Sequence, residues 1–371
     1  MKAQIRLAAF ALLFSTLDPQ LSTAFAQGSL APPGAPAPTM KTLAQIEPRS
    51  PISSAPFTIT VPGSYYLTTN VTTTTSIAIV IATSGVTLDL NGFIISSTVA
   101  NAAIGGTAIL LGSGLSDISI LNGHILSGVA NNGSGVYAGS GFAGGIFYSG
   151  MAPVNTRVSG VSVAGCLNFG IYLGTGSSTV VEACTVRTVG SNGIYASSIK
   201  GSVAVDCGGY AIDGDQVSDC RGECTGSSDG LFAYYTAQNC IGISGTGTGL
   251  YGATAQNCIG TSVSGTGLNA LTAQNCYGYG GSSPGISAET ASNCYGFSAS
   301  NRGISANFAI SCSGRCDVGG SYGLFATSVA NTCYGYSHSG TGLSAIIAIG
   351  CIGANISGPS VSYINHYNMP P

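Results

Sequence analysis

Carboxylates that could act as acids, bases or metal ligands gather in one stretch of this chain. Six of its thirteen acidic residues lie between positions 206 and 229, with basic residues close by in sequence. Carboxylates can move protons, and their oxygen atoms suit calcium. The candidate catalytic residues are Lys200, Asp206, Asp213 and Asp215, and the candidate calcium ligands are Asp213, Asp215 and Asp219. Because the spacing of these acids is irregular, a solvated loop is the alternative explanation.

Thirteen cysteines form a second group, and most of them recur at a fixed interval. Five fall 18 residues apart and two more follow after 21 and 18: Cys240, Cys258, Cys276, Cys294, Cys312, Cys333 and Cys351. Side chains that stack in a line and point the same way suit neither the dihedral angle of a disulfide nor tetrahedral zinc. We therefore expect small buried thiols. The pairs Cys220/Cys224 and Cys312/Cys316 each include a cysteine outside this interval and are the better disulfide candidates.

The elements that must position these groups are short repeats, of which Gly267 to Gly278 is one clear example. A unit this short cannot bury its own apolar face, so successive coils must stack, with equivalent residues about 4.8 Å apart. The sequence therefore predicts an all-β, right-handed, single-stranded parallel β-helix with about 18 to 22 residues per coil. We expect stacked columns of Leu or Ile, of Ala and of Cys inside. Asn residues before the cysteines should form left-handed bends with stacked amides.

A stripe of large side chains follows from strand alternation. If each cysteine points inward, the residues one and three positions later point outward. The aromatic members of this stripe are Tyr277, Tyr279, Tyr295, Phe297, Tyr334 and Tyr336. An exposed aromatic band can stack on sugar rings or receive a protein partner. The alternative is a register in which the tyrosines lie inside and the cysteines lie at a corner.

The chain divides into three parts by composition. Residues 1–26 have the charged start, apolar core and small-residue site of a secretory signal, with cleavage expected near Ala26. Residues 27–56 form a Pro-rich lead-in, and residues 57–371 form the β-helix domain. We expect an exported protein, in the periplasm, in the medium or at the cell surface, without a membrane span.

Charge excludes one class of function. Only 6% of the residues are charged, the net charge is −3, and Lys and Arg are scattered singly. A nucleic-acid-binding protein needs a basic surface, which this sequence does not provide.

Two segments are similar to known proteins. The segment VTLDLNGFII, from Val86 to Ile95, resembles a strand and turn of β-helix proteins in the pectate-lyase-like superfamily. The lead-in from Ala35, with the later Pro56 and Pro62 segments, is similar to the opening of exported right-handed β-helix proteins of environmental bacteria. The resemblance covers nearly the whole mature chain and implies fold and export rather than an activity.

Three functions remain open. The first is a non-catalytic exported rod that binds glycans or cell-surface proteins along one face, without a cofactor. The second is a divergent polysaccharide lyase or hydrolase. The resemblance implies that a lyase would use calcium-bound carboxylates with a Lys or Arg base, and adjacent coils could bring Lys200, Asp206 and Asp229 together. The family's hydrolases have an Asp-Asp pair next to a Gly-His-Gly or Arg-x-Lys set, and this sequence has no such arrangement. The third is a structural envelope or appendage component that self-associates through its aromatic stripe.

Overall fold

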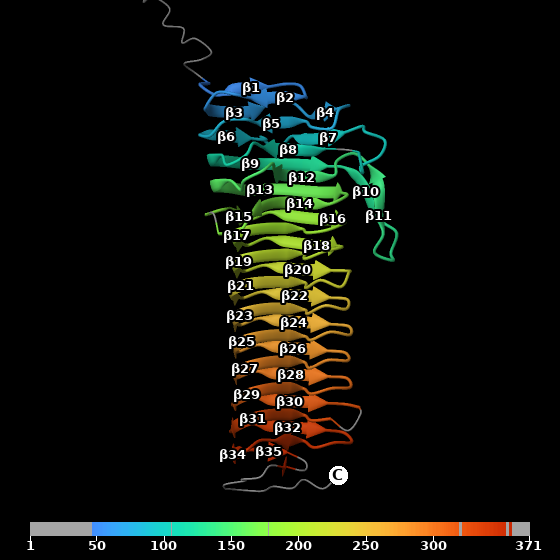
Figure 1. Ribbon diagram of the computed structural model, residues 1–371, viewed down its shortest axis with the longest axis vertical. Coiled ribbons are helices and arrows are strands. Elements are labelled where there is room, and N and C mark those ends of the chain that lie inside the picture. Colours follow the sequence, from blue (N-terminus) through green and yellow to red (C-terminus); the bar gives the residue numbers. More distant parts are fainter. Residues whose placement is uncertain (1–46, 105, 177, 319–320, 354–355, 358–371) are drawn as a thin grey trace, which may run out of the picture. The chain divides into compact units, whose positions relative to one another are not determined.

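The computed structural model describes residues 47–357 except 105, 177, 319–320 and 354–355. The chain divides into two units, Met1–Pro48 and Arg49–Pro371. The second unit is a parallel β-solenoid of about 16 turns, and no helix occurs among the described residues (Figure 1). The prediction of an all-β parallel solenoid is confirmed. The predicted signal and the lead-in up to residue 46 lie outside the described residues.

Short strands build the first coils. They are β1 (Ser50–Ile52), β2 (Phe57–Ile59), β3 (Gly63–Leu67), β4 (Val71–Thr73), β5 (Ile79–Ile81), β6 (Val86–Asp89), β7 (Ile94–Ser97), β8 (Thr107–Leu111), β9 (Ser116–Leu126), β12 (Gly144–Tyr148), β13 (Val154–Cys166), β14 (Phe169–Gly174) and β15 (Val180–Glu182). The sheet begins before the predicted domain start at Phe57, because β1 pairs in parallel with β3. Proline is tolerated in a first strand, so Pro51 does not prevent this pairing.

Further along the chain a shorter and a longer strand alternate. The shorter strands are β16 (Thr185–Val189), β18 (Val203–Cys207), β20 (Arg221–Cys224), β22 (Ile241–Ser244), β24 (Ile259–Ser262), β26 (Tyr277–Gly280), β28 (Tyr295–Ser298), β30 (Ser313–Cys316), β32 (Tyr334–Ser337) and β35 (Ile352–Gly353). The longer ones are β17 (Ile194–Lys200), β19 (Ile212–Ser218), β21 (Leu231–Gln238), β23 (Leu250–Gln256), β25 (Leu268–Gln274), β27 (Ile286–Ser292), β29 (Ile304–Ile310) and β31 (Leu324–Asn331), followed by β33 (Leu343–Ser344), β34 (Ile347–Ile349) and β36 (Ile356–Ser357). From β16 to β32, each strand pairs with its equivalents in the coils before and after it.

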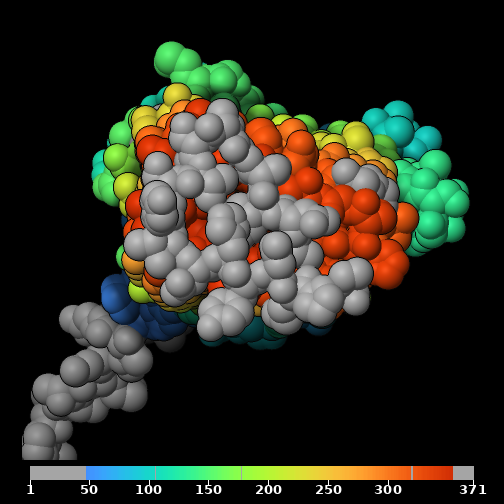
Figure 2. Space-filling view, turned by 90° about the horizontal axis from the view of Figure 1, so that it is seen from below, coloured from blue at the N-terminus to red at the C-terminus, as the bar shows by residue number. Residues whose placement is uncertain are grey.

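One antiparallel hairpin interrupts the stack. It consists of β10 (Gly128–Asn131) and β11 (Tyr137–Ser140). The Tyr137 hydroxyl lies 3.0 Å from the Asp206 carboxylate and 2.9 Å from the Thr225 hydroxyl, and Asn131 donates to Asp206. Seen from the C-terminal end, teal and green segments from the first half of the chain project beyond the later coils (Figure 2).

The interior is a set of in-register columns. Leu250, Leu268, Ile286 and Ile304 form one buried column, as predicted. Alanines and cysteines form others, so the later coils enclose little volume. Glycines face each other across this narrow interior: a Cβ on Gly278 would lie 2.1 Å from the carbonyl oxygen of Gly285.

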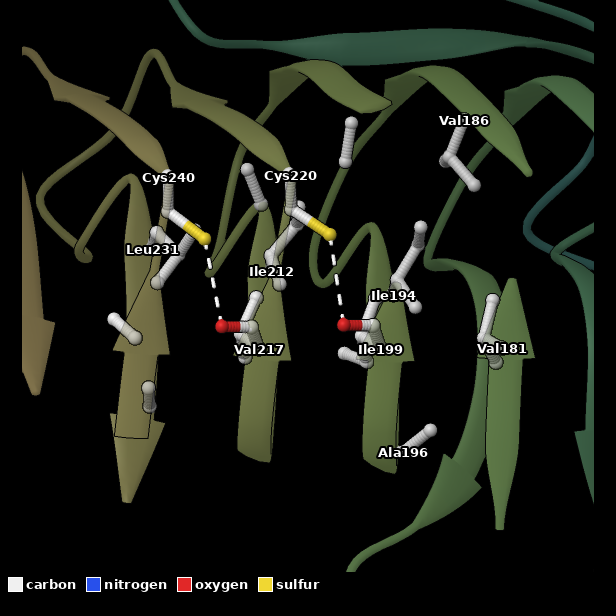
Figure 3. Close-up of a cluster of buried hydrophobic side chains, with 14 of the residues drawn as sticks. Val181, Val186, Ile194, Ala196, Ile199, Ile212, Val217, Cys220, Leu231 and Cys240 are labelled. Carbon is white, nitrogen blue, oxygen red and sulfur yellow. Dashed lines mark hydrogen bonds between the residues drawn. The ribbon is translucent and has the colours of Figure 1, made fainter. Parts of the chain in front are cut away.

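All thirteen cysteines are buried and free, as expected for thiols that fill the tube. The two disulfide candidates are wrong. Cys220 and Cys224 lie at opposite ends of an extended segment, about 13 Å apart at 3.3 Å per residue, beyond the reach of a disulfide. Cys220 instead precedes Cys240 in the cysteine column (Figure 3). Cys312 and Cys316 are separated in the same way by β30.

The thiols donate to backbone carbonyl groups inside the tube. The Cys220 sulfur lies 3.6 Å from the Ile199 oxygen, and the Cys240 sulfur lies 3.5 Å from the Val217 oxygen (Figure 3). Each therefore points toward the preceding coil's backbone rather than toward solvent.

An asparagine corner precedes the cysteine column, as predicted. Asn239, Asn257, Asn275 and Asn293 have φ between 52° and 55°. The amide of Asn257 donates to Asn239 and that of Asn275 donates to Asn257, both at 3.2 Å. Asparagine suits this corner because it tolerates the left-handed region and because its amide can both donate and accept.

Replacing Asn275 should separate these two contributions. We expect Asn275→Ala to lower the free energy of unfolding by about 1 to 2 kcal/mol, since Ala resists the left-handed conformation and loses the amide bonds. Asn275→Gly should cost less, because glycine adopts positive φ freely. Chemical denaturation of the full chain measures both. Equal losses in the two variants would contradict the backbone part of this explanation.

Candidate functional site

The predicted aromatic stripe faces outward. Tyr277, Tyr295 and Tyr334 are 37%, 38% and 38% exposed, whereas the cysteines that precede them are at most 3% exposed. The register with tyrosines inside is therefore wrong. Tyr279, Phe297 and Tyr336 lie on the same side of their strands and are half-buried.

The rings of this stripe stack on one another along the solenoid. Tyr277 and Tyr295 have centroids 5.6 Å apart and planes within 9°, and Tyr279 and Phe297 have centroids 5.4 Å apart and planes within 15°. Because the rings cover each other's faces, part of their surface is already used within the stripe.

An arginine divides the stripe. Arg315 of β30 lies 5.7 Å from the ring centroids of both Phe297 and Tyr336, and it bonds Asp317 at 2.7 Å. A guanidinium between two rings is a favourable cation–π arrangement. Tyr334 and Tyr336 are thus separated from the other four aromatic residues by one coil.

A shallow open groove of about 560 Å³ runs beside the first column of the stripe. Three residues of the asparagine corner, Asn257, Asn275 and Asn293, line one side of it. Ile259, Tyr277 and Tyr295 line the other. The remaining lining residues are Cys258, Cys276, Cys294, Ser311 and Ser313. We call this the amide–tyrosine groove. None of its lining side chains carries a formal charge at neutral pH.

Hydrogen-bonding capacity remains free along this groove. An asparagine amide has two N–H groups and an oxygen with two lone pairs, and one bond to the next coil uses only part of that set. The corner therefore offers a spare donor and acceptor in each coil, about 4.8 Å apart. A linear polar ligand lying along the axis could meet several such amides.

The acidic candidates separate into two groups. Asp213 and Asp215 project from the same side of β19, and burial together with the charges of Asp215 and Asp229 raises the pKa of Asp213 to about 6. Asp215 accepts from the Gly176 amide at 3.0 Å, and Asp229 accepts from the Thr248 amide at 2.8 Å. Burial also raises the pKa of Asp229.

The other candidates lie elsewhere. Asp206 is held by the hairpin. Lys200 is exposed and lies at one end of β17. Tyr195, which pairs in register with Asp213, lies at the other end, so Lys200 is far from Asp213. Asp219 accepts from Asn239 at the asparagine corner. The expected meeting of Lys200, Asp206 and Asp229 therefore does not occur. Within the described ranges, no group of three or more His, Cys, Asp or Glu residues is arranged to hold a metal ion, so the three calcium candidates do not form one site.

Sequence reasoning missed a second aromatic column, which surrounds Asp213. Tyr172, Tyr195, Phe232 and Tyr251 occupy equivalent outward positions in neighbouring coils. The Tyr172 and Tyr195 centroids are 4.7 Å apart, and those of Phe232 and Tyr251 are 4.8 Å apart. The available signal was the residue directly after each buried Leu or Ile at the start of a long strand. Asp213 takes that position between Tyr195 and Phe232.

No helix in the described part of the chain is long and apolar enough to cross a membrane. No protein-family model matches this sequence, and comparison with curated proteins and with solved structures gives no match.

Proposed function

We propose that this chain is an exported right-handed β-helix protein, related to the pectate-lyase-like superfamily, that binds an uncharged linear glycan in the amide–tyrosine groove without cleaving it. The observation that supports this most is the pairing of an amide column with an aliphatic and aromatic column along one open groove. Glycans present hydroxyl groups and apolar ring faces, which match these two walls. Export rests on the residues before position 27.

Charge favours a neutral ligand over an acidic one. The groove lining is uncharged, and the nearest basic residue of the stripe, Arg315, is already bonded to Asp317. An acidic polysaccharide would lose water from its carboxylates with no cation to receive them.

Calorimetric titration with soluble neutral glycans tests this proposal. We expect measurable binding that weakens about tenfold, or about 1.4 kcal/mol, in Tyr277→Ala and in Tyr295→Ala, because each removes part of one wall. The matched controls are Tyr234→Ala and Tyr235→Ala, whose side chains are 58% and 55% exposed on β21, outside the groove. Binding that survives both groove substitutions, or no binding of any glycan, would refute the proposal. Concentration-dependent association that the groove substitutions abolish would favour a self-assembling structural component.

A second candidate function is hydrolysis of a polysaccharide at Asp213. A carboxyl group with a pKa of about 6 retains its proton in mildly acidic solution, up to about pH 6, and can act there as a general acid. The charges of Asp215 and Asp229 are near enough to raise this pKa. Aromatic rings on both sides could hold a sugar chain. A lyase would need a basic residue beside Asp213, and neither candidate provides one. Lys200 lies at the far end of β17, and Arg221 bonds Glu223. Release of reducing ends that Asp213→Asn abolishes would establish this activity.

A further inference from the structure

The cysteine column continues without interruption through eight coils. Its members are Cys220, Cys240, Cys258, Cys276, Cys294, Cys312, Cys333 and Cys351. The residues on both sides of each cysteine are in register, as for Gln238 with Gln256 and Ile241 with Ile259. Neighbouring cysteines are therefore one strand spacing apart, about 4.8 Å.

This spacing matches one coordination geometry. A metal–thiolate bond is about 2.3 Å long, so two such bonds in a straight line span about 4.6 Å. Side chains that point the same way from adjacent coils cannot surround a tetrahedral ion, but they can bind an ion placed midway between two sulfur atoms. We propose that the cysteine column binds soft metal ions of linear two-coordinate geometry, each held between the thiolates of two adjacent coils.

The charge balance suits the apolar interior. Two thiols and one Hg²⁺ ion give a neutral S–Hg–S unit and release two protons, one from each sulfur. A neutral product avoids the cost of burying a net charge. Thiolates are also the ligands that soft ions prefer.

Backbone carbonyl groups hold each thiol of the column in place. The Cys276 thiol lies 3.1 Å from the Gln274 carbonyl oxygen and 3.4 Å from the Ala255 carbonyl oxygen. Both contacts keep the Cys276 sulfur inside the tube.

The amide–tyrosine groove provides the access route. Cys258, Cys276 and Cys294 line it, although each is at most 3% exposed. Ions should therefore enter the column at these three coils.

The test uses the reduced, folded full chain titrated with mercuric chloride. X-ray absorption should give two sulfur neighbours per ion, and a pH-stat should record about two protons released per ion. Cys258→Ala/Cys294→Ala isolates Cys276 and breaks the column into shorter runs, so it should bind about two ions fewer than the unmodified chain.

The matched control also removes two cysteines. Cys166 has Val189 as its register partner, and Cys316 lies between Ser298 and Ser337, so neither has a cysteine neighbour in these pairs. Cys166→Ala/Cys316→Ala should therefore bind as many two-coordinate ions as the unmodified chain. Equal losses in both double variants, or one sulfur per ion, would overturn the proposal. If the alanine variant of the column does not fold, Cys258→Ser/Cys294→Ser replaces it, because Ser202 already occupies the equivalent position beside Cys220.

Discussion

Gly278→Ala is expected to lower the free energy of unfolding by about 3 kcal/mol or more, the upper range for overpacking a well-filled interior. The added Cβ would lie 2.1 Å from the Gly285 carbonyl oxygen and 2.4 Å from a side-chain carbon of Ile286. That carbonyl cannot turn away easily, because it accepts from the Leu268 amide of the preceding coil at 2.9 Å. The midpoint of chemical denaturation of the full chain measures the loss.

Gly144→Ala is the matched control for this substitution. Its Cβ would meet nothing closer than the Thr107 side chain at 3.5 Å, an ordinary contact. We expect a change within about 0.5 kcal/mol. Similar losses at both positions would mean that the narrow interior does not set the requirement for glycine, since Gly→Ala by itself reduces the entropy of the unfolded chain and favours folding.

Asp213→Asn is expected to stabilise the solenoid above pH 6 and to have little effect below about pH 4. The pKa of Asp213 is about 6 when folded, against 3.8 for an unperturbed aspartate, so the native state keeps its proton while the unfolded state loses one. The stability that Asp213 contributes is therefore complete below pH 3.8 and is lost as the pH rises through 6. Since one pKa unit corresponds to about 1.36 kcal/mol, Asn should gain about 1 to 3 kcal/mol at pH 8.

Denaturation midpoints of both proteins at pH 4 and pH 8 measure this effect. Asp117 provides the opposite case, because hydrogen bonds from Asn155 and Ser116 lower its pKa. Asp117→Asn should therefore cost stability at both pH 4 and pH 8, and this cost should disappear only as the pH falls below 3.8 through the lowered pKa. A difference between Asp213→Asn and the unmodified chain that does not change with pH would contradict the assigned origin of the raised pKa. Stability gained together with activity lost would also identify Asp213 as a functional residue.

The regular coils could be predicted from sequence because their period is constant. Leu250, Leu268 and Ile286 recur every 18 residues, and Asn and Gly mark the corners, so in-register stacking follows from the spacing alone. The alternation of inward cysteines and outward tyrosines followed from the same regularity. Cys220 escaped the pattern, because 20 residues separate it from Cys240 and it was assigned to a disulfide instead.

The surroundings of Asp213 were harder to predict. The coils that carry Tyr172, Tyr195 and Phe232 differ in length, so no constant interval links these residues in the sequence. Their neighbourhood depends on bulges, such as the register shift in the pairing of β14 with β17. The orientation of the tyrosine rings, which stack on each other, depends on side-chain packing that spacing does not encode.

The likeness between coils has a consequence for folding. A newly formed strand with the sequence of β25 can pair almost equally well with β23 and with β27. If a strand docks one repeat away from its native partner, one whole coil is left out of the stack, but few of the native contacts are lost. Such a mispaired intermediate would be long-lived, because escape requires breaking many good bonds. Two irregular features distinguish correct from shifted docking. One is the 21-residue interval between Cys312 and Cys333. The other is the hairpin, because the Tyr137 hydroxyl can bond Asp206 and Thr225 only when their coils are docked in the correct order. These irregularities therefore favour the native register in a chain whose other coils are nearly alike.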